Sequence, residues 1–163
     1  MSFAPWQHAV HWLALGFGLG RIPGSPGTFG TLLAVPLFVL MSRLGPAPYA
    51  AIVVVMFVAG IFICGQTARD FGEVDPGYIV YDEIVGFLVA MFMLPADWRW
   101  IVAGFILFRI FDIWKPFPVD WVEDKLGTGA SIMADDVIAG LYTLAILHAA
   151  RVVLERLSAQ GVS

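Results

Sequence analysis

The sequence has little charge, one cysteine and no excess of basic residues. Only 13% of its 163 residues are charged, well below the ~25% typical of soluble domains. The single cysteine, Cys64, excludes an internal disulfide framework. A formal net charge of −4 argues against nucleic-acid binding, which needs a basic surface. The N-terminus lacks the basic segment of a signal peptide, so we expect the mature helices themselves to direct membrane insertion.

Hydrophobic residues dominate instead, at 60% of the chain and a mean hydropathy of +0.84. A helix that spans a bilayer needs ~20 mostly apolar residues. The sequence therefore predicts one all-α domain over residues 1–163, a polytopic membrane helical bundle with about five transmembrane helices. The predicted spans are residues 31–44, 49–64, 78–94, 98–114 and 135–157. Residues 1–20 predict an N-terminal interfacial or re-entrant helix, with a true span as the alternative.

Polar segments separate the apolar runs. With this count of crossings, residues 21–30, 66–83 and 109–136 fall on one face of the membrane. We interpret residues 66–77 and 116–134 as connections, the second with a turn at residues 127–129. Basic residues flank both faces equally, so the positive-inside rule does not decide the orientation.

Acidic residues lie in or beside the apolar runs, where ionisable groups are expensive and usually mark a site or a pathway. The first pair is Asp82-Glu83. Neighbouring residues on a helix diverge by about a quarter turn. The pair could therefore bind one metal together or divide into a ligand and a base. The alternative is a favourable interaction of both acids with the helix dipole.

Arg109, Asp112 and Lys115 form a second cluster. Their spacing of three places Asp112 within reach of both bases on one side of a helix. A carboxylate near a helix C-terminus opposes the dipole, which favours a functional role for Asp112. We predict that Asp112 binds a metal and that Arg109 and Lys115 bind phosphate oxygens. A buried Arg–Asp ion pair is the alternative.

Two further candidates lie at predicted helix starts. Asp135 and Asp136 are predicted metal ligands, with capping of the last helix as the alternative. Ser25, Gly27 and Thr28 belong to a loop that opens a helix. Backbone N–H groups at a helix start attract phosphate. We predict an anion site there, and a plain helix start is the alternative.

Clustered carboxylates favour Mg²⁺ over zinc, because hard cations prefer oxygen ligands. The three histidines lie in separate segments, which disfavours a phosphohistidine mechanism. A membrane transporter or channel is the main alternative, with the carboxylates as a cation or proton pathway spread across the depth of the bilayer. A structural membrane subunit, whose charges pair with another protein, is a second alternative. The chain lacks the D-G-x-x-A-R pattern of a phosphatidyltransferase.

Four segments of the chain carry a family resemblance, and they occur in the family's order. They are GFGLGRIPGSPGTFGTL (16–32), DPGYIVYDEIVG (75–86), FRIFDIWKPFP (108–118) and GTGASIMADDVIAG (127–140). Through these segments the sequence resembles the phosphatidylglycerophosphatase A family over roughly residues 12–150. Each motif alone is modest, whereas four in order are specific.

The resemblance implies a Mg²⁺-dependent enzyme of the bacterial inner membrane with an all-α fold. Such an enzyme removes the terminal phosphate of phosphatidylglycerophosphate to give phosphatidylglycerol, in glycerophospholipid biosynthesis, at a site facing the cytoplasm. The hypothesis assigns metal ligands and one general base to Asp82, Glu83, Asp112, Asp135 and Asp136, with Asp82, Glu83, Asp112 and Asp136 catalytic. It assigns the substrate phosphate to Arg109, Lys115, Ser25, Gly27 and Thr28.

Overall fold

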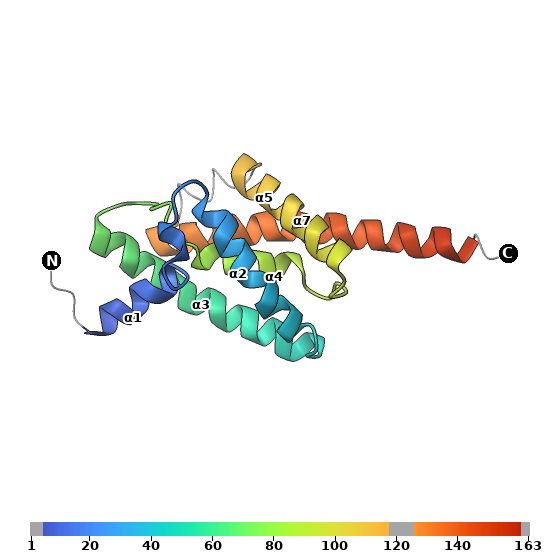
Figure 1. The fold of residues 1–163 in the computed structure, drawn as a ribbon, viewed down its shortest axis with the longest axis horizontal. Coiled ribbons are helices and arrows are strands. Elements are labelled where there is room, and N and C mark those ends of the chain that lie inside the picture. Colours follow the sequence, from blue (N-terminus) through green and yellow to red (C-terminus); the bar gives the residue numbers. More distant parts are fainter. Residues whose placement is uncertain (1–4, 118–125, 161–163) are drawn as a thin grey trace.

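The computed structural model describes residues 5–117 and 126–160, and these residues form helices without a strand. The elements are α1 (Pro5–Ala14), the 3-10 helix η1 (Leu19–Arg21), α2 (Pro26–Met41), α3 (Pro46–Phe71), α4 (Tyr81–Ala90), α5 (Trp98–Trp114) and α7 (Thr128–Gln160). Figure 1 shows α4 among the longer helices, while the C-terminal part of α7 extends beyond the others. The prediction of an all-α fold is confirmed.

Helix α4 lies at the centre of the bundle. It packs against α2, α3, α5 and α7, and Val85, Phe87 and Leu88 are fully buried. The hydroxyl of Tyr49 on α3 donates a 2.7 Å hydrogen bond to the carbonyl of Leu88 near the end of α4. A short helix enclosed on several sides places any polar side chain of its first turn inside the protein.

Glycines let α7 approach its neighbours closely. A Cβ atom on Gly140 would overlap the carbonyl oxygen of Gly86 on α4. A Cβ atom on Gly129 would likewise overlap the carbonyl of Ile61 on α3 and press on Gly65. Two helix crossings on the N-terminal half of α7 therefore depend on the absence of a side chain, as in other closely packed apolar helices.

Helix α7 starts earlier than predicted. We expected a turn at residues 127–129 and a helix from residue 135, whereas the helix begins at Thr128. The physical reason is that Gly129 packs against Gly65 inside a helix crossing and does not form a turn. Asp135 and Asp136 consequently lie about two turns inside α7, and the alternative that they cap the helix is wrong.

Helix α3 extends further than predicted, because part of the expected polar connection over residues 66–77 is helical up to Phe71. Its polar side chains bond to one another along the helix: Gln66 donates to Asp70 at 2.8 Å and Arg69 donates to Gln66 at 3.1 Å. Such i,i+3 and i,i+4 pairs support a helix locally, so polarity alone does not end it.

Helix α5 has the predicted bounds, residues 98–114. The carboxylate of Asp97 accepts a hydrogen bond from the backbone N–H of Arg99 at 2.9 Å, which caps the start. Lys115 follows the helix with φ 46°, in the left-handed region, and Pro116 comes next. Proline disfavours helix in the residue before it, which explains why the helix ends where the sequence predicts.

The prediction of about five transmembrane helices is wrong. Within residues 5–117 and 126–160, only α3 and α7 are long and apolar enough to cross a membrane. The ten residues of α4 reach about 15 Å at 1.5 Å per residue, half of a ~30 Å hydrocarbon core. The 16 residues of α2 and the 17 of α5 reach only about 24–26 Å. Hydropathy alone did not reveal that the run at 78–94 is enclosed by protein.

The two long helices keep much of their apolar surface exposed. In each, only 22% of the most apolar stretch is buried inside the protein. Val54, Val55 and Val58 on α3 are 59%, 67% and 60% exposed. A continuous apolar surface of this kind is typical of contact with lipid or a partner. The two helices are therefore compatible with membrane association.

The N-terminal segment forms the short helix α1, which has ten residues and packs against α3. At ~1.5 Å per residue it is too short for the true span considered as an alternative. The backbone N–H of Val80 donates to the carbonyl of Ala14 at 2.9 Å, which ties the end of α1 to the chain that enters α4. The predicted connection over residues 116–134 falls partly at residues 118–125, outside the described residues.

Candidate active site

Three of the predicted carboxylates converge inside the bundle. Asp82 and Glu83 lie in the first turn of α4 and Asp136 lies on α7, and one oxygen from each is within 4.8 Å of the others. All three residues are buried. Asp82 Oδ1 and Glu83 Oε2 make no hydrogen bond within the described part of the chain. Buried oxygens of like charge without donors form a suitable set of ligands for a cation.

The raised pKa values of the two acids on α4 also favour a cation site. Burial raises the pKa of Glu83 to about 8, and the neighbouring charge of Asp136 adds to this rise. Burial and the charge of Glu83 raise the pKa of Asp82 well above its ordinary value. A buried carboxylate stays ionised at neutral pH when a nearby positive charge offsets the lost hydration. The oxygen donors therefore fit a hard divalent cation such as Mg²⁺.

Arg109 lies at the edge of this group. Its Nη1 forms an ion pair with Asp112 on the same helix and lies 3.7 Å from Glu83 Oε1. The Arg–Asp pair considered as an alternative for Asp112 is thus present, and Asp112 also interacts electrostatically with Asp136. Arg109 Nε is buried and makes no hydrogen bond within residues 5–117 and 126–160. One side of the guanidinium can therefore take a further acceptor.

Lys115 and Asp135 form a separate pair beside the three carboxylates. Lys115 Nζ donates a 2.9 Å hydrogen bond to Asp135 Oδ2 and lies 3.9 Å from Asp75 Oδ2. The group within 4.8 Å includes Asp136 but not Asp135. Asp75 and Asp135 line a small cavity of about 70 Å³ with Ser131. Asp75 is not among the predicted site residues, because it lies in the predicted connection over residues 66–77. Its place at the start of the segment 75–86, which carries the family resemblance, is the signal that could have identified it.

The loop that opens α2 lies against Glu83 and Arg109. A Cβ atom on Gly27 would overlap Glu83 Oε1 and the guanidinium of Arg109. The hydroxyls of Ser25 and Thr28 lie 2.6 Å apart in a hydrogen bond. The backbone N–H of Thr28 donates to the carbonyl of Ser25 at 3.1 Å, so this amide is already engaged within the turn. Gly27 is therefore the member of the predicted anion loop that directly contacts the carboxylate–arginine pair.

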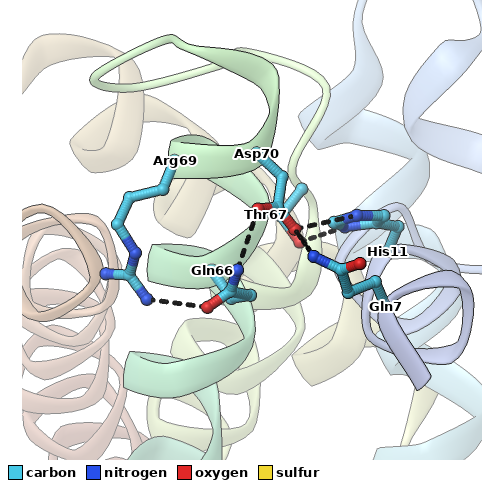
Figure 2. Close-up of polar contacts among 6 residues, drawn as sticks. All are labelled: Gln7, His11, Gln66, Thr67, Arg69 and Asp70. Carbon is cyan, nitrogen blue, oxygen red and sulfur yellow. Dashed lines mark hydrogen bonds and ion pairs between the residues drawn. The ribbon is translucent and has the colours of Figure 1, made fainter. Parts of the chain in front are cut away.

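A second polar cluster, missed in the sequence, joins α1 to α3 (Figure 2). The ring of His11 lies between Thr67 and Asp70: Nδ1 is 3.0 Å from Thr67 Oγ1 and Nε2 is 3.3 Å from Asp70 Oδ2. Gln7 also donates to Asp70 Oδ2 at 3.1 Å. No local pattern in the sequence indicates this pairing, because 59 residues separate His11 from Asp70. The cluster fixes α1 on α3, and its residues are not among the three convergent carboxylates.

The comparisons with known proteins agree on one family. The family model of phosphatidylglycerophosphatase A matches residues 12–151, which include the carboxylates, the α2 loop and Arg109. Phosphatidylglycerophosphatase A of Escherichia coli (strain K12) is 43% identical over 145 residues, 88% of this chain and 82% of the relative. The Haemophilus influenzae protein of the same name is 42% identical over 142 residues, 86% of this chain and 87% of the relative.

A further relative carries a different name. A protein of Bacteroides thetaiotaomicron, provisionally named phosphatidylinositol-3-phosphatase, is 39% identical over 150 residues, 87% of this chain and 93% of the relative. No solved structure matches the chain. With most of its length matched by the family model and by relatives above 40% identity, the chain belongs to the phosphatidylglycerophosphatase A family.

Proposed function

We propose that this protein is a Mg²⁺-dependent lipid phosphatase that hydrolyses the terminal phosphomonoester of phosphatidylglycerophosphate to phosphatidylglycerol. Membership of the family makes it a phosphoric monoester hydrolase. The observation that carries the proposal is the convergence of Asp82, Glu83 and Asp136 within 4.8 Å, with the guanidinium of Arg109 at their edge. This arrangement pairs a cation site with a phosphate-binding side chain.

In this proposal Asp82, Glu83 and Asp136 hold the metal ion. Bound Mg²⁺ neutralises phosphoryl oxygens and positions or activates water. Asp112 and Asp135 were predicted as ligands from the sequence as well. Each lies next to the group and pairs with a base, Asp112 with Arg109 and Asp135 with Lys115. Their direct participation stays a prediction, as does the identity of the general base among the five acids.

Basic side chains beside the three carboxylates bind the phosphate in this proposal. Arg109 provides a planar fork and Lys115 a point charge, and Gly27 lets the start of α2 lie directly against Glu83 and Arg109. In hydrolysis, a water oxygen attacks the phosphorus and the bond from phosphorus to the terminal glycerol oxygen breaks. The leaving oxygen takes a proton, so the products are inorganic phosphate and phosphatidylglycerol. Ser25 and Thr28 complete the predicted phosphate loop.

The apolar exterior fits a substrate with two acyl chains. We place the protein in the bacterial inner membrane, with the site facing the cytoplasm where this lipid is made. The exposed apolar surfaces of α3 and α7 support a membrane location. A transporter would distribute its acids along a path through the bilayer, whereas here three acids share one point. The family match gives no support to that alternative.

The test is phosphate release by the purified protein in detergent. We expect release from phosphatidylglycerophosphate with Mg²⁺, loss of release on chelation, and recovery when Mg²⁺ is restored. Phosphatidylinositol 3-phosphate is the comparison substrate, because of the name of the Bacteroides relative. A higher kcat/KM for the inositol lipid would assign a different head group. No release from either lipid would refute the proposal.

A further inference from the structure

An apolar groove between α2 and α5 borders the site at Thr28 and Arg109. The groove has a volume of about 700 Å³. Two of its lining residues, Thr28 and Arg109, belong to the predicted phosphate site. The rest of the lining is apolar and includes Phe105, Ile106, Ile110 and Ile113. One cavity therefore joins hydrogen-bonding groups for an anion to a hydrocarbon surface.

The isoleucines of the groove follow the helical repeat. Ile106, Ile110 and Ile113 are spaced by four and three residues, so they form one stripe along α5. Their side chains are 52%, 49% and 73% exposed, which leaves them available to a ligand. Arg109 lies within this stripe, and its ion pair with Asp112 holds the guanidinium beside the carboxylates.

We propose that this groove binds an acyl chain of the lipid substrate while Arg109 and Thr28 hold its phosphate end. The inference rests on the proposed function, and it adds a surface that selects for chain length. The occupant follows from continuity with the phosphate site, because a ligand that fills the groove must be anionic at one end and hydrocarbon at the other. An apolar helix of a partner protein would cover the isoleucines but would offer no acceptor to Arg109 Nε, which makes no hydrogen bond within the described residues.

A second apolar groove on the other face of α2 is the competing location. It has a volume of about 440 Å³ and is lined by Leu37, Leu40 and Tyr81, among others. None of the residues placed in the phosphate site lines it. The groove beside Arg109 is therefore the better assignment, and the two locations can be separated by mutation.

The test compares long-chain and short-chain substrates. Ile106→Trp and Ile110→Trp place a bulky ring in the groove, and Leu40→Trp does so in the competing groove. Ile52→Trp on α3 is the matched surface control, since Ile52 is 38% exposed and lines neither groove. For each purified variant, kcat/KM is measured on dioleoyl and dihexanoyl phosphatidylglycerophosphate in detergent with Mg²⁺.

We expect the ratio of long-chain to short-chain kcat/KM to fall at least about tenfold in Ile106→Trp and Ile110→Trp, because small changes of fit in an apolar pocket have effects of this size. Leu40→Trp and Ile52→Trp should keep the wild-type ratio. If Ile106→Trp and Ile110→Trp do not fold, Ile113→Trp replaces them in the test. A larger side chain is tolerated at this position because Ile113 is 73% exposed.

The outcomes distinguish failure of the groove assignment from failure of the proposed function. An unchanged ratio in all three variants of the α5 groove overturns the assignment of the acyl chain. A change confined to Leu40→Trp also overturns it, by moving the chain to the other side of α2. If the wild-type protein releases no phosphate from either lipid, the proposed function itself fails and the groove assignment fails with it.

Discussion

Gly27 lies directly against Glu83, so closely that a Cβ atom on the glycine would overlap the carboxylate oxygen Oε1. The same Cβ atom would also meet the guanidinium of Arg109. The starts of α2 and α4 and the C-terminal part of α5 therefore meet at one point. Only a residue without a side chain lets all three elements come together there.

The substitution Gly27→Ala tests this contact. The added methyl group must displace Glu83 or Arg109, and a misplacement of about 1 Å in an active site can cost about 100-fold in rate. We expect kcat/KM for phosphate release to fall by about that factor. Gly77→Ala is the control, because a Cβ atom there meets nothing within 4 Å. Equal activity of the two variants would contradict a role for the Gly27 contact.

The neighbours Asp135 and Asp136 should respond differently to loss of charge. A cation that binds the folded state at 100 times its Kd stabilises it by about 2.7 kcal/mol, so Mg²⁺ should raise the Tm of the wild-type protein. We expect Asp136→Asn to lose this shift, because Asp136 belongs to the three-carboxylate group. Asp135→Asn tests the prediction that Asp135 is also a ligand; because Asp135 pairs with Lys115 and lies outside the three-carboxylate group, we expect this variant to keep the shift. A full Mg²⁺ shift in Asp136→Asn would remove that residue from the metal site.

Asp112→Asn should reduce phosphate release while leaving the protein folded. The substitution removes the negative charge that orients Arg109, and loss of such a supporting partner typically costs about 10–100-fold. Turnover and thermal unfolding are measured on the same preparation. Asp97→Asn is the control on the same helix, since asparagine caps a helix as well as aspartate does. Near-normal turnover in Asp112→Asn would take Asp112 out of the site.

The His11 cluster should make the docking of α1 dependent on pH. Burial lowers the pKa of His11, Asp70 opposes this effect, and His8 and Arg21 add to it. The unfolded segment has an ordinary pKa of about 6.5 and so takes up a proton first as the pH falls. The contribution of neutral His11 is therefore complete above about pH 6.5 and is lost as the pH falls toward the lower folded pKa.

Hydrogen exchange of α1 measures this effect. After correction for intrinsic exchange rates, we expect residues 7–14 to exchange faster at about pH 5 than at about pH 7.5. Helix α5 serves as the internal reference, because it contains none of the charged residues that shift the pKa of His11. In His11→Gln the pH dependence should disappear, because glutamine does not titrate. Persistence of the full dependence in that variant would assign it to another group.

Local signals were sufficient to predict some elements. The sequence by itself determined the bounds of α5, because Asp97 caps the start and Pro116 follows the end. It also determined the helical class and the low charge of the chain. Both properties depend on neighbours within a few residues or on composition, and neither requires knowledge of distant contacts.

Tertiary contacts decided what the sequence could not. Helix α7 starts at Thr128 because Gly129 packs against Gly65 on α3, a contact between residues far apart in the chain. The number of crossings was overestimated for a related reason. An apolar run is equally apolar whether lipid or protein covers it, and α4 is covered by protein.

For the site, the sequence determined which side chains are available, and the fold decided which of them meet. Asp135 and Asp136 are chemically identical neighbours, yet only Asp136 joins Asp82 and Glu83. Consecutive residues on a helix point about 100° apart. The rotation of α7 about its axis, set where Gly140 packs against Gly86 on α4, turns one aspartate toward the buried carboxylates and leaves the other beside Lys115.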